Sequence, residues 1–264
     1  MAETTAPLPP GLQAAIDAAW TIWPWQGPRR RLILCHCNVC VSQAQADLLA
    51  RTDPRDLPAA LLAEYTNSAH GYDADIEVEF KELLPRYFEL LAALDPPSLD
   101  GEYDFTLNRL HDADYRTRWP APEVAAVDAF FTAWLPHAAA ISPPDTGFCA
   151  SCGGRHSPSS DLDGMISMLV HAGFGAGRII AVIDADRSAA MSLHLAILIL
   201  HKTETQGAGF VFNAIMLSDR LDDACALGDW LRSADMGARL EAAFFDTDDP
   251  AHQTLLSNAA ACCG

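Results

Sequence analysis

The chain has 264 residues, of which 50 % are hydrophobic and 20 % are charged, a composition that is typical of globular proteins and excludes a disordered chain. Its 35 Asp and Glu residues outnumber its 17 Lys and Arg residues, which gives a formal net charge of −18. Such a charge repels nucleic acids and anionic membranes, so it argues against both as partners and favours basic proteins or cations.

Apolar residues at helical spacing dominate the N-terminal half of the chain. Ser42 is a suitable N-cap and Pro58 suits the first turn of a helix. Pro85 interrupts the longest apolar stripe, which predicts a kink or two abutting helices there. The helices predicted in this half cover residues 11–20, 43–51, a stretch opening at 58, 77–94 and 123–140.

The run 141–163 is rich in Pro, Ser and Gly and predicts a seam in the chain. It separates an N-terminal helical half, 1–145, from a C-terminal helical half, 146–264, although the two could form one continuous domain. The C-terminal half contains two strand candidates, 178–183 and 210–212. The stretch 162–174 and an apolar stretch, 179–200, follow the seam. Helices are predicted over 214–232 and 236–245, with Asp249 and Pro250 opening a last one.

Together these elements predict an all-α fold, an irregular multi-helix bundle or helical stack in two packed halves with cysteine-bearing loops. The most apolar run, 189–200, is shorter than the ~20 residues that a membrane-spanning helix needs. The first residues lack the basic and apolar segments of a secretion signal. We therefore expect a cytoplasmic protein, in whose reducing surroundings cysteines serve as metal ligands or buried thiols before disulfides.

Two C-x-x-C pairs, Cys37 with Cys40 and Cys149 with Cys152, are the strongest motifs in the chain. This spacing lets two thiolates bind one metal ion from a tight turn. We predict that the four sulfurs form a structural Zn²⁺ site. More than a hundred residues separate the pairs, so a redox-active C-x-x-C and unliganded thiols stay as alternatives. Three neighbouring side chains are reserve ligands: Cys35, His36 and His156.

Histidines of the C-terminal half offer a second place for a metal ion. His194 and His201 are seven residues apart and share one helix face, and His171 lies upstream. With Asp184 or Asp186 they could bind a catalytic metal. The chain has no H-E-x-x-H or comparable motif, however, and a histidine in an apolar helix is more often a hydrogen-bonded core residue.

The segment 37–94 resembles one found in poorly characterised bacterial proteins. The likeness lies in the first cysteine pair, then Asp53-Pro-Arg-Asp-Leu57, then Tyr65, and above all Phe80-Lys-Glu-Leu-Leu-Pro-Arg86. The resemblance covers about a quarter of the chain. It implies a helical bacterial protein with an early cysteine pair and no established activity.

The leading hypothesis is a non-enzymatic, acidic, α-helical binding protein with a structural zinc site and a basic protein partner. An immunity-type protein that neutralises a basic toxin fits, because opposite charge favours association. Acidic clusters at 73–79, 219–223 and 246–249 are typical of solvated faces, but gathered on one side they could form its docking surface. The alternatives are the metal-dependent enzyme above and a thiol-based metal carrier or sensor, which would use Cys35, Cys37, Cys40, Cys262 and Cys263.

Overall fold

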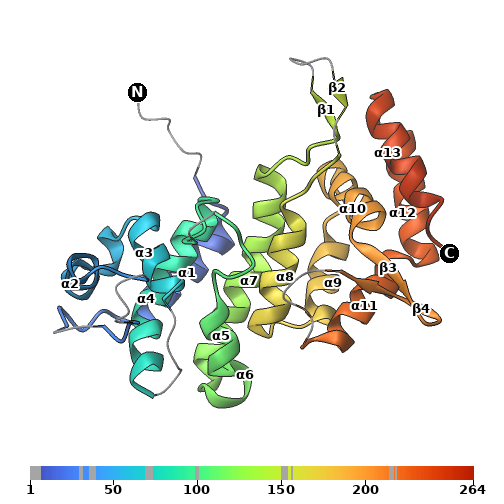
Figure 1. Ribbon diagram of the computed structural model, residues 1–264. Coiled ribbons are helices and arrows are strands. Elements are labelled where there is room, and N and C mark those ends of the chain that lie inside the picture. Colours follow the sequence, from blue (N-terminus) through green and yellow to red (C-terminus); the bar gives the residue numbers. More distant parts are fainter. Residues whose placement is uncertain are drawn as a thin grey trace. The chain divides into compact units, whose positions relative to one another are not determined.

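The computed structural model describes residues 7–29, 32–35, 40–68, 74–98, 101–149, 154–155, 157–213, 217 and 219–264. The fold is mostly helical (Figure 1), which confirms the predicted all-α class. The chain forms two compact units, residues 1–137 and 138–264.

The N-terminal unit consists of helices joined by short connections. Its elements are α1 (Pro10–Ile22), α2 (Gln43–Arg51), the 3₁₀ turn η1 (Pro54–Asp56), α3 (Ala59–Thr66), α4 (Ala74–Ala92), α5 (Asn108–Ala113), α6 (Tyr115–Arg118) and most of α7 (Ala121–Ile141). The Ser42 hydroxyl accepts a hydrogen bond from the Gln45 amide, and the Gln45 side chain accepts from the Ser42 amide. This capping box confirms the predicted start of α2.

The helix α4 is continuous through Pro85, so the alternative of two abutting helices is wrong. Phe80 and Leu84 before the proline, and Phe88 after it, are all completely buried. Because this single apolar stripe packs into one core, packing compensates for the one hydrogen bond that a proline cannot donate.

Aromatic side chains join α4 to α7 within the N-terminal unit. The rings of Phe88 and Phe130 stack with their centroids 3.8 Å apart. The Trp134 indole, which is completely buried, donates a hydrogen bond of 2.9 Å to the Leu91 carbonyl at the end of α4. Stacking and burial of such large side chains make this pair of helices the centre of the unit.

Among the described residues, α7 is the one helix long and apolar enough to cross a membrane, with a mean hydropathy of 1.4 over its 18-residue window. Core helices of soluble proteins share this property, and Phe130, Phe131 and Leu135 of α7 are completely buried. The cytoplasmic location stays a prediction.

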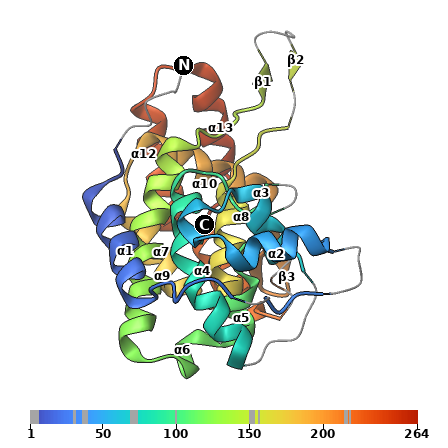
Figure 2. The same ribbon diagram turned by 90° about the vertical axis from the view of Figure 1, so that its left-hand side faces the viewer.

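The C-terminal unit combines helices with two short antiparallel hairpins. Its elements are β1 (Phe148–Cys149), β2 (Gly154–Arg155), α8 (Leu162–Ala172), α9 (Ala176–Ala185), α10 (Ala189–His201), β3 (Thr203–Gln206), β4 (Gly209–Phe212), α11 (Leu221–Leu231), α12 (Ala234–Phe245) and α13 (Pro250–Ala260). The hairpin β1–β2 projects away from the helices of its unit (Figure 1 and Figure 2).

Of the two strand candidates, 210–212 is confirmed in β4, whereas 178–183 lies inside α9. A short apolar run rich in isoleucine suits a buried strand and a buried helix equally. Packing against α8 and α11 decides for the helix, because it buries Ile179 and Ile183, four residues apart, on one face.

Side-chain caps mark where three helices of this unit begin. The Asp249 carboxylate accepts hydrogen bonds from the amides of Ala251 and His252, which confirms the predicted start of α13. The Ser188 and Ser233 hydroxyls cap α10 and α12 in the same way. Each cap satisfies an amide that has no partner inside its helix.

Gly228 lets α11 approach β4 closely enough for backbone contact. A Cβ atom at this position would lie 2.6 Å from the Phe210 carbonyl and from the Val211 Cα, both backbone atoms that cannot move aside alone. We expect Gly228→Ala to lower the free energy of unfolding by about 2 kcal/mol, the scale of an overpacked core. Chemical denaturation measures it.

Gly177 is the matched control, because it lies in α9 with nothing within 4 Å of a Cβ atom there. Gly177→Ala should raise stability by roughly 0.5–1 kcal/mol, since alanine loses less entropy in a helix. Equal effects of the two substitutions would contradict the close approach.

Candidate functional site

The four-cysteine zinc prediction falls largely outside the described residues. Cys37 and Cys152 are not described, and of Cys149 only the backbone is. Cys149 ends β1 and Gly154 begins β2, so the second C-x-x-C starts where a hairpin strand ends. Cys40 is half-buried. The shared site therefore stays a prediction, and of its reserve ligands only Cys35 is described.

Of the two C-terminal cysteines, Cys263 is held by hydrogen bonds to the main chain. The Cys263 thiol lies 3.5 Å from the carbonyl oxygens of Leu231 and Ala259, to which it donates. Burial raises the pKa of this thiol, which keeps it protonated at neutral pH. Metals bind the thiolate, so burial weighs against Cys263 in the carrier site considered from the sequence, which stays a prediction.

A histidine and an aspartate of the C-terminal unit meet in an arrangement that could hold a metal ion. His171 lies in the last turn of α8 and is 8 % exposed, and Asp219 lies in the segment that leads into α11. A ring nitrogen of His171 and a carboxylate oxygen of Asp219 lie within 4.8 Å of each other. Two ligands of one zinc ion, each about 2 Å from it, lie no more than ~4 Å apart, a separation that this limit includes.

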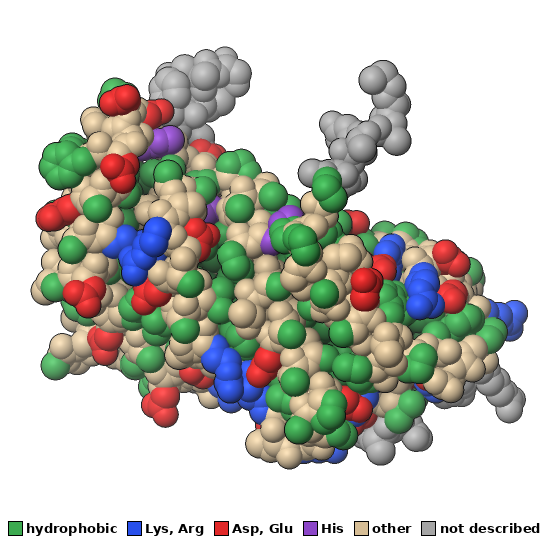
Figure 3. Space-filling view, turned by 180° about the vertical axis from the view of Figure 1, so that it is seen from behind, with side chains coloured by type: hydrophobic (Ala, Val, Ile, Leu, Met, Phe, Trp, Pro, Cys, Tyr) green, Lys and Arg blue, Asp and Glu red, His purple; other side chains and the backbone are tan. Residues whose placement is uncertain are grey.

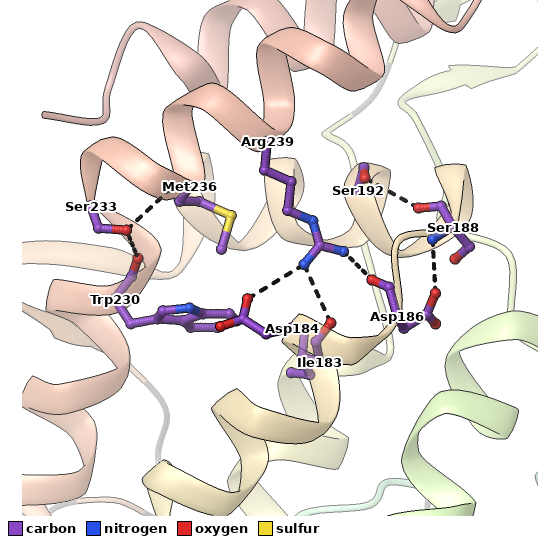
Figure 4. Close-up of polar contacts among 9 residues, drawn as sticks. All are labelled: Ile183, Asp184, Asp186, Ser188, Ser192, Trp230, Ser233, Met236 and Arg239. Atoms are coloured by element: carbon purple, nitrogen blue, oxygen red, sulfur yellow. Dashed lines mark hydrogen bonds and ion pairs between the residues drawn. The ribbon is translucent and has the colours of Figure 1, made fainter.

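The expected carboxylates belong to Asp184 and Asp186 at the end of α9, where Arg239 of α12 contacts the Asp184 side chain and the Asp186 main-chain carbonyl (Figure 4). Asp184 pairs with the Arg239 guanidinium, and the Asp186 side chain accepts from the Ser188 amide. Within the described part of the C-terminal unit, the carboxylate that His171 meets is Asp219 instead.

His194 is part of a polar chain in the C-terminal unit. Its Nε2 lies 3.0 Å from the Ala139 carbonyl oxygen and its Nδ1 lies 2.7 Å from the Ser160 Oγ. A carbonyl only accepts, so Nε2 carries the proton, Nδ1 accepts, and the Ser160 hydroxyl donates to it. Burial lowers the pKa of His194, which is 1 % exposed, so the ring is neutral at pH 7.

Ser160 also borders a cavity of about 360 Å³. The Leu162 amide, at the start of α8, donates to its Oγ over 3.1 Å. A second cavity of about 900 Å³ shares Pro158 and His201 with the first. Sequence reasoning missed Ser160, because its partner is 34 residues further along the chain and no local motif connects them.

Several acidic residues of the predicted docking surface serve the fold of the C-terminal unit. Asp223 accepts from the Ala176 amide at the start of α9, and Asp249 caps α13. Outside the predicted clusters, Asp229 accepts from the Phe210 amide. In Figure 3, on the face shown, red acidic side chains are dispersed among green and tan ones over this unit. Acidic residues outnumber basic ones by 20 to 10 in residues 1–137 and by 15 to 7 in residues 138–264.

The basic partner, and with it the immunity-type function, therefore stays a prediction that rests on the net charge of the chain.

Comparison with known proteins returned no match to a family model, to a curated protein or to a solved structure. The candidate sites therefore stand on their own geometry and chemistry.

Proposed function

We propose that this chain is a metal-binding helical protein in which His171 and Asp219 hold a structural Zn²⁺ ion. The observation that carries the proposal is the pair of ligand atoms within 4.8 Å of each other. Imidazole nitrogen and carboxylate oxygen are both common zinc ligands, and zinc in a structural site is bound by four ligands in a closed tetrahedron.

The positions of the two residues favour a structural role for the ion. His171 is fixed in the last turn of a buried helix, whereas Asp219 lies outside the helices, two residues before α11 begins at Leu221. An ion bound to both would tie that segment to the helix core. Binding to the folded state alone raises stability, by about 2.7 kcal/mol when the free metal is at 100 times its dissociation constant.

We expect the purified protein to contain zinc and to melt at a lower temperature after treatment with EDTA, with recovery when Zn²⁺ is added back. His171→Ala and Asp219→Asn should each abolish this metal-dependent shift, and the double variant should lose no more than either one. The readout is the difference between metal-loaded and metal-free melting temperatures, because it separates lost ligation from lost packing of the buried histidine.

Two matched controls come from the same unit. Asp222→Asn removes an exposed carboxylate in the first turn of α11, and His201→Ala removes an exposed histidine at the end of α10. Both should keep the full metal-dependent shift. An unchanged shift in His171→Ala would overturn the proposal.

Two further variants in the same experiment test the four-cysteine prediction. Cys37→Ser and Cys149→Ser should reduce the zinc content if the thiolates bind the metal, while leaving the His171-dependent shift in place. Elemental analysis of each variant tells the two zinc proposals apart.

A further inference from the structure

The polar chain Ala139–His194–Ser160 has the connectivity of a catalytic nucleophile with an oriented base. A hydroxyl donates to one ring nitrogen of a neutral histidine, and the other nitrogen is held by a fixed acceptor. Here the acceptor is a backbone carbonyl of α7, so the tautomer and the ring orientation are set by the main chain. All three residues belong to the C-terminal unit.

Main-chain groups also hold the Ser160 hydroxyl in place. The amide of Leu162 donates to its oxygen, which fixes the position of the hydroxyl beside His194. Asp161, the N-cap of α8, makes no side-chain cap, since its carboxylate accepts from the Ser142 hydroxyl at 2.6 Å. The first-turn amides of α8 are therefore not capped by that carboxylate, and they point toward the end of the helix where Ser160 lies.

The two adjoining cavities provide room for a substrate beside this hydroxyl. The smaller one, on which Ser160 lies, is polar at one side, where the Lys202 ammonium pairs with Asp163 at 2.5 Å. The larger one, which shares Pro158 and His201 with it, is lined by apolar groups, among them Leu200, Pro250 and Leu255. A compact apolar group fits such a lining, while the polar side accommodates a carbonyl and its leaving group.

We propose that Ser160 and His194 form a nucleophile–base pair that hydrolyses carboxylic esters with a compact apolar acyl group. The Ser160 Oγ forms a bond to the ester carbonyl carbon while its proton passes to His194 Nδ1 and the carbonyl electron pair moves to oxygen. The carbon–oxygen bond to the leaving alcohol then breaks, and the alcohol takes the proton from Nδ1. Water attacks the acyl-serine in the same manner, which releases the carboxylic acid and restores the serine.

The test uses the full-length protein with a fluorophosphonate, which phosphonylates reactive serines, and with p-nitrophenyl butyrate as substrate. We expect one adduct by intact mass, mapped to Ser160, and measurable release of p-nitrophenol. Ser160→Ala should abolish the adduct and lower hydrolysis by about 10²-fold or more, the scale of base-assisted nucleophilic catalysis. The neighbouring exposed serine supplies the matched control, Ser159→Ala, which should keep both activities.

His194→Gln should lower the rate of labelling at Ser160 with circular dichroism unchanged. Because His194 is buried, its substitution can unfold the protein, so a second variant tests the pair with His194 in place. In Ser160→Cys the new thiol beside His194 should react with iodoacetamide faster than the thiol of Ser159→Cys. A lack of any adduct, an adduct that persists in Ser160→Ala, or equal thiol reactivity would overturn the proposal and leave Ser160 with a purely structural hydrogen bond to the Leu162 amide.

Labelling after EDTA treatment separates this proposal from the zinc proposal. The serine reaction uses no metal, so it should persist at the same rate in the metal-free protein and in the His171→Ala variant. Loss of the zinc-dependent melting shift without loss of labelling, or the reverse, tells which of the two fails.

Discussion

Arg239→Ala should lower the free energy of unfolding by about 3 kcal/mol, because it removes a buried cation that satisfies the end of a helix. The guanidinium is 5 % exposed and donates to the carbonyl oxygens of Ile183 and Asp186, where α9 ends (Figure 4). It also lies 3.7 Å from the Asp184 carboxylate. The last carbonyls of a helix lack the usual partner one turn further along. Without Arg239 the Asp186 carbonyl loses this donor, whereas the Ile183 carbonyl keeps the Asp186 amide as a partner.

Denaturation with urea measures this effect, and a second arginine provides the control. Burial, and after it the charge of Arg187, lowers the pKa of Arg239. Arg187 itself is exposed, so Arg187→Ala removes a repulsive neighbour and should leave stability unchanged or slightly higher. Arg239→Lys should fall between the wild type and Arg239→Ala, since one ammonium cannot reach two carbonyls and a carboxylate as a planar guanidinium does. Similar losses in Arg187→Ala and Arg239→Ala would contradict this account.

Glu79→Gln should remove a pH-dependent loss of stability that the wild type shows between about pH 4.5 and pH 7. Glu79 lies on α4, is 3 % exposed, and both its carboxyl oxygens accept from the Ile33 amide, at 3.1 and 3.3 Å. Burial raises the pKa of this carboxyl to about 7, against hydrogen bonds from Ile33 and Tyr65 that lower it.

The sign follows from proton binding in the two states. The folded protein holds the Glu79 proton up to about pH 7, while the unfolded chain loses it near the ordinary pKa of 4.5. The contribution of Glu79 is therefore fully present below about pH 4.5 and is lost as the pH rises through 7. At about 1.4 kcal/mol for each pKa unit, the loss amounts to roughly 3 kcal/mol.

Unfolding free energies from pH 4.5 to 8 test this prediction by the difference between wild type and Glu79→Gln. The glutamine side chain cannot ionise and keeps an oxygen that accepts from the Ile33 amide. From pH 4.5 to pH 8 the free energy of unfolding of the variant should therefore rise by roughly 3 kcal/mol relative to that of the wild type. Glu102→Gln removes an exposed carboxyl of the same unit and controls for net charge. A difference that does not change with pH would show that Glu79 is ionised in the folded protein throughout.

The sequence by itself determined the helical class and most helix starts of this protein. These features are local: Ser42 with Gln45, and Asp249 with the two amides that follow Pro250, lie within three residues of their partners. The apolar stripe of α4 repeats at the helical period, so it can be read without knowing what it packs against. The C-x-x-C pairs are equally local, but spacing alone cannot bring two distant pairs to one ion.

Only the tertiary structure decided that residues 178–183 are helical and which polar side chains meet. His171 and Asp219 are 48 residues apart, Ser160 and His194 are 34 apart, and Ile33 and Glu79 are 46 apart. Such pairs form because separate helices bury their apolar faces against one another, and that packing carries the polar groups into contact. A histidine in an apolar helix gives no sign of its partner, since the partner is chosen by the neighbouring element and not by the residues beside it.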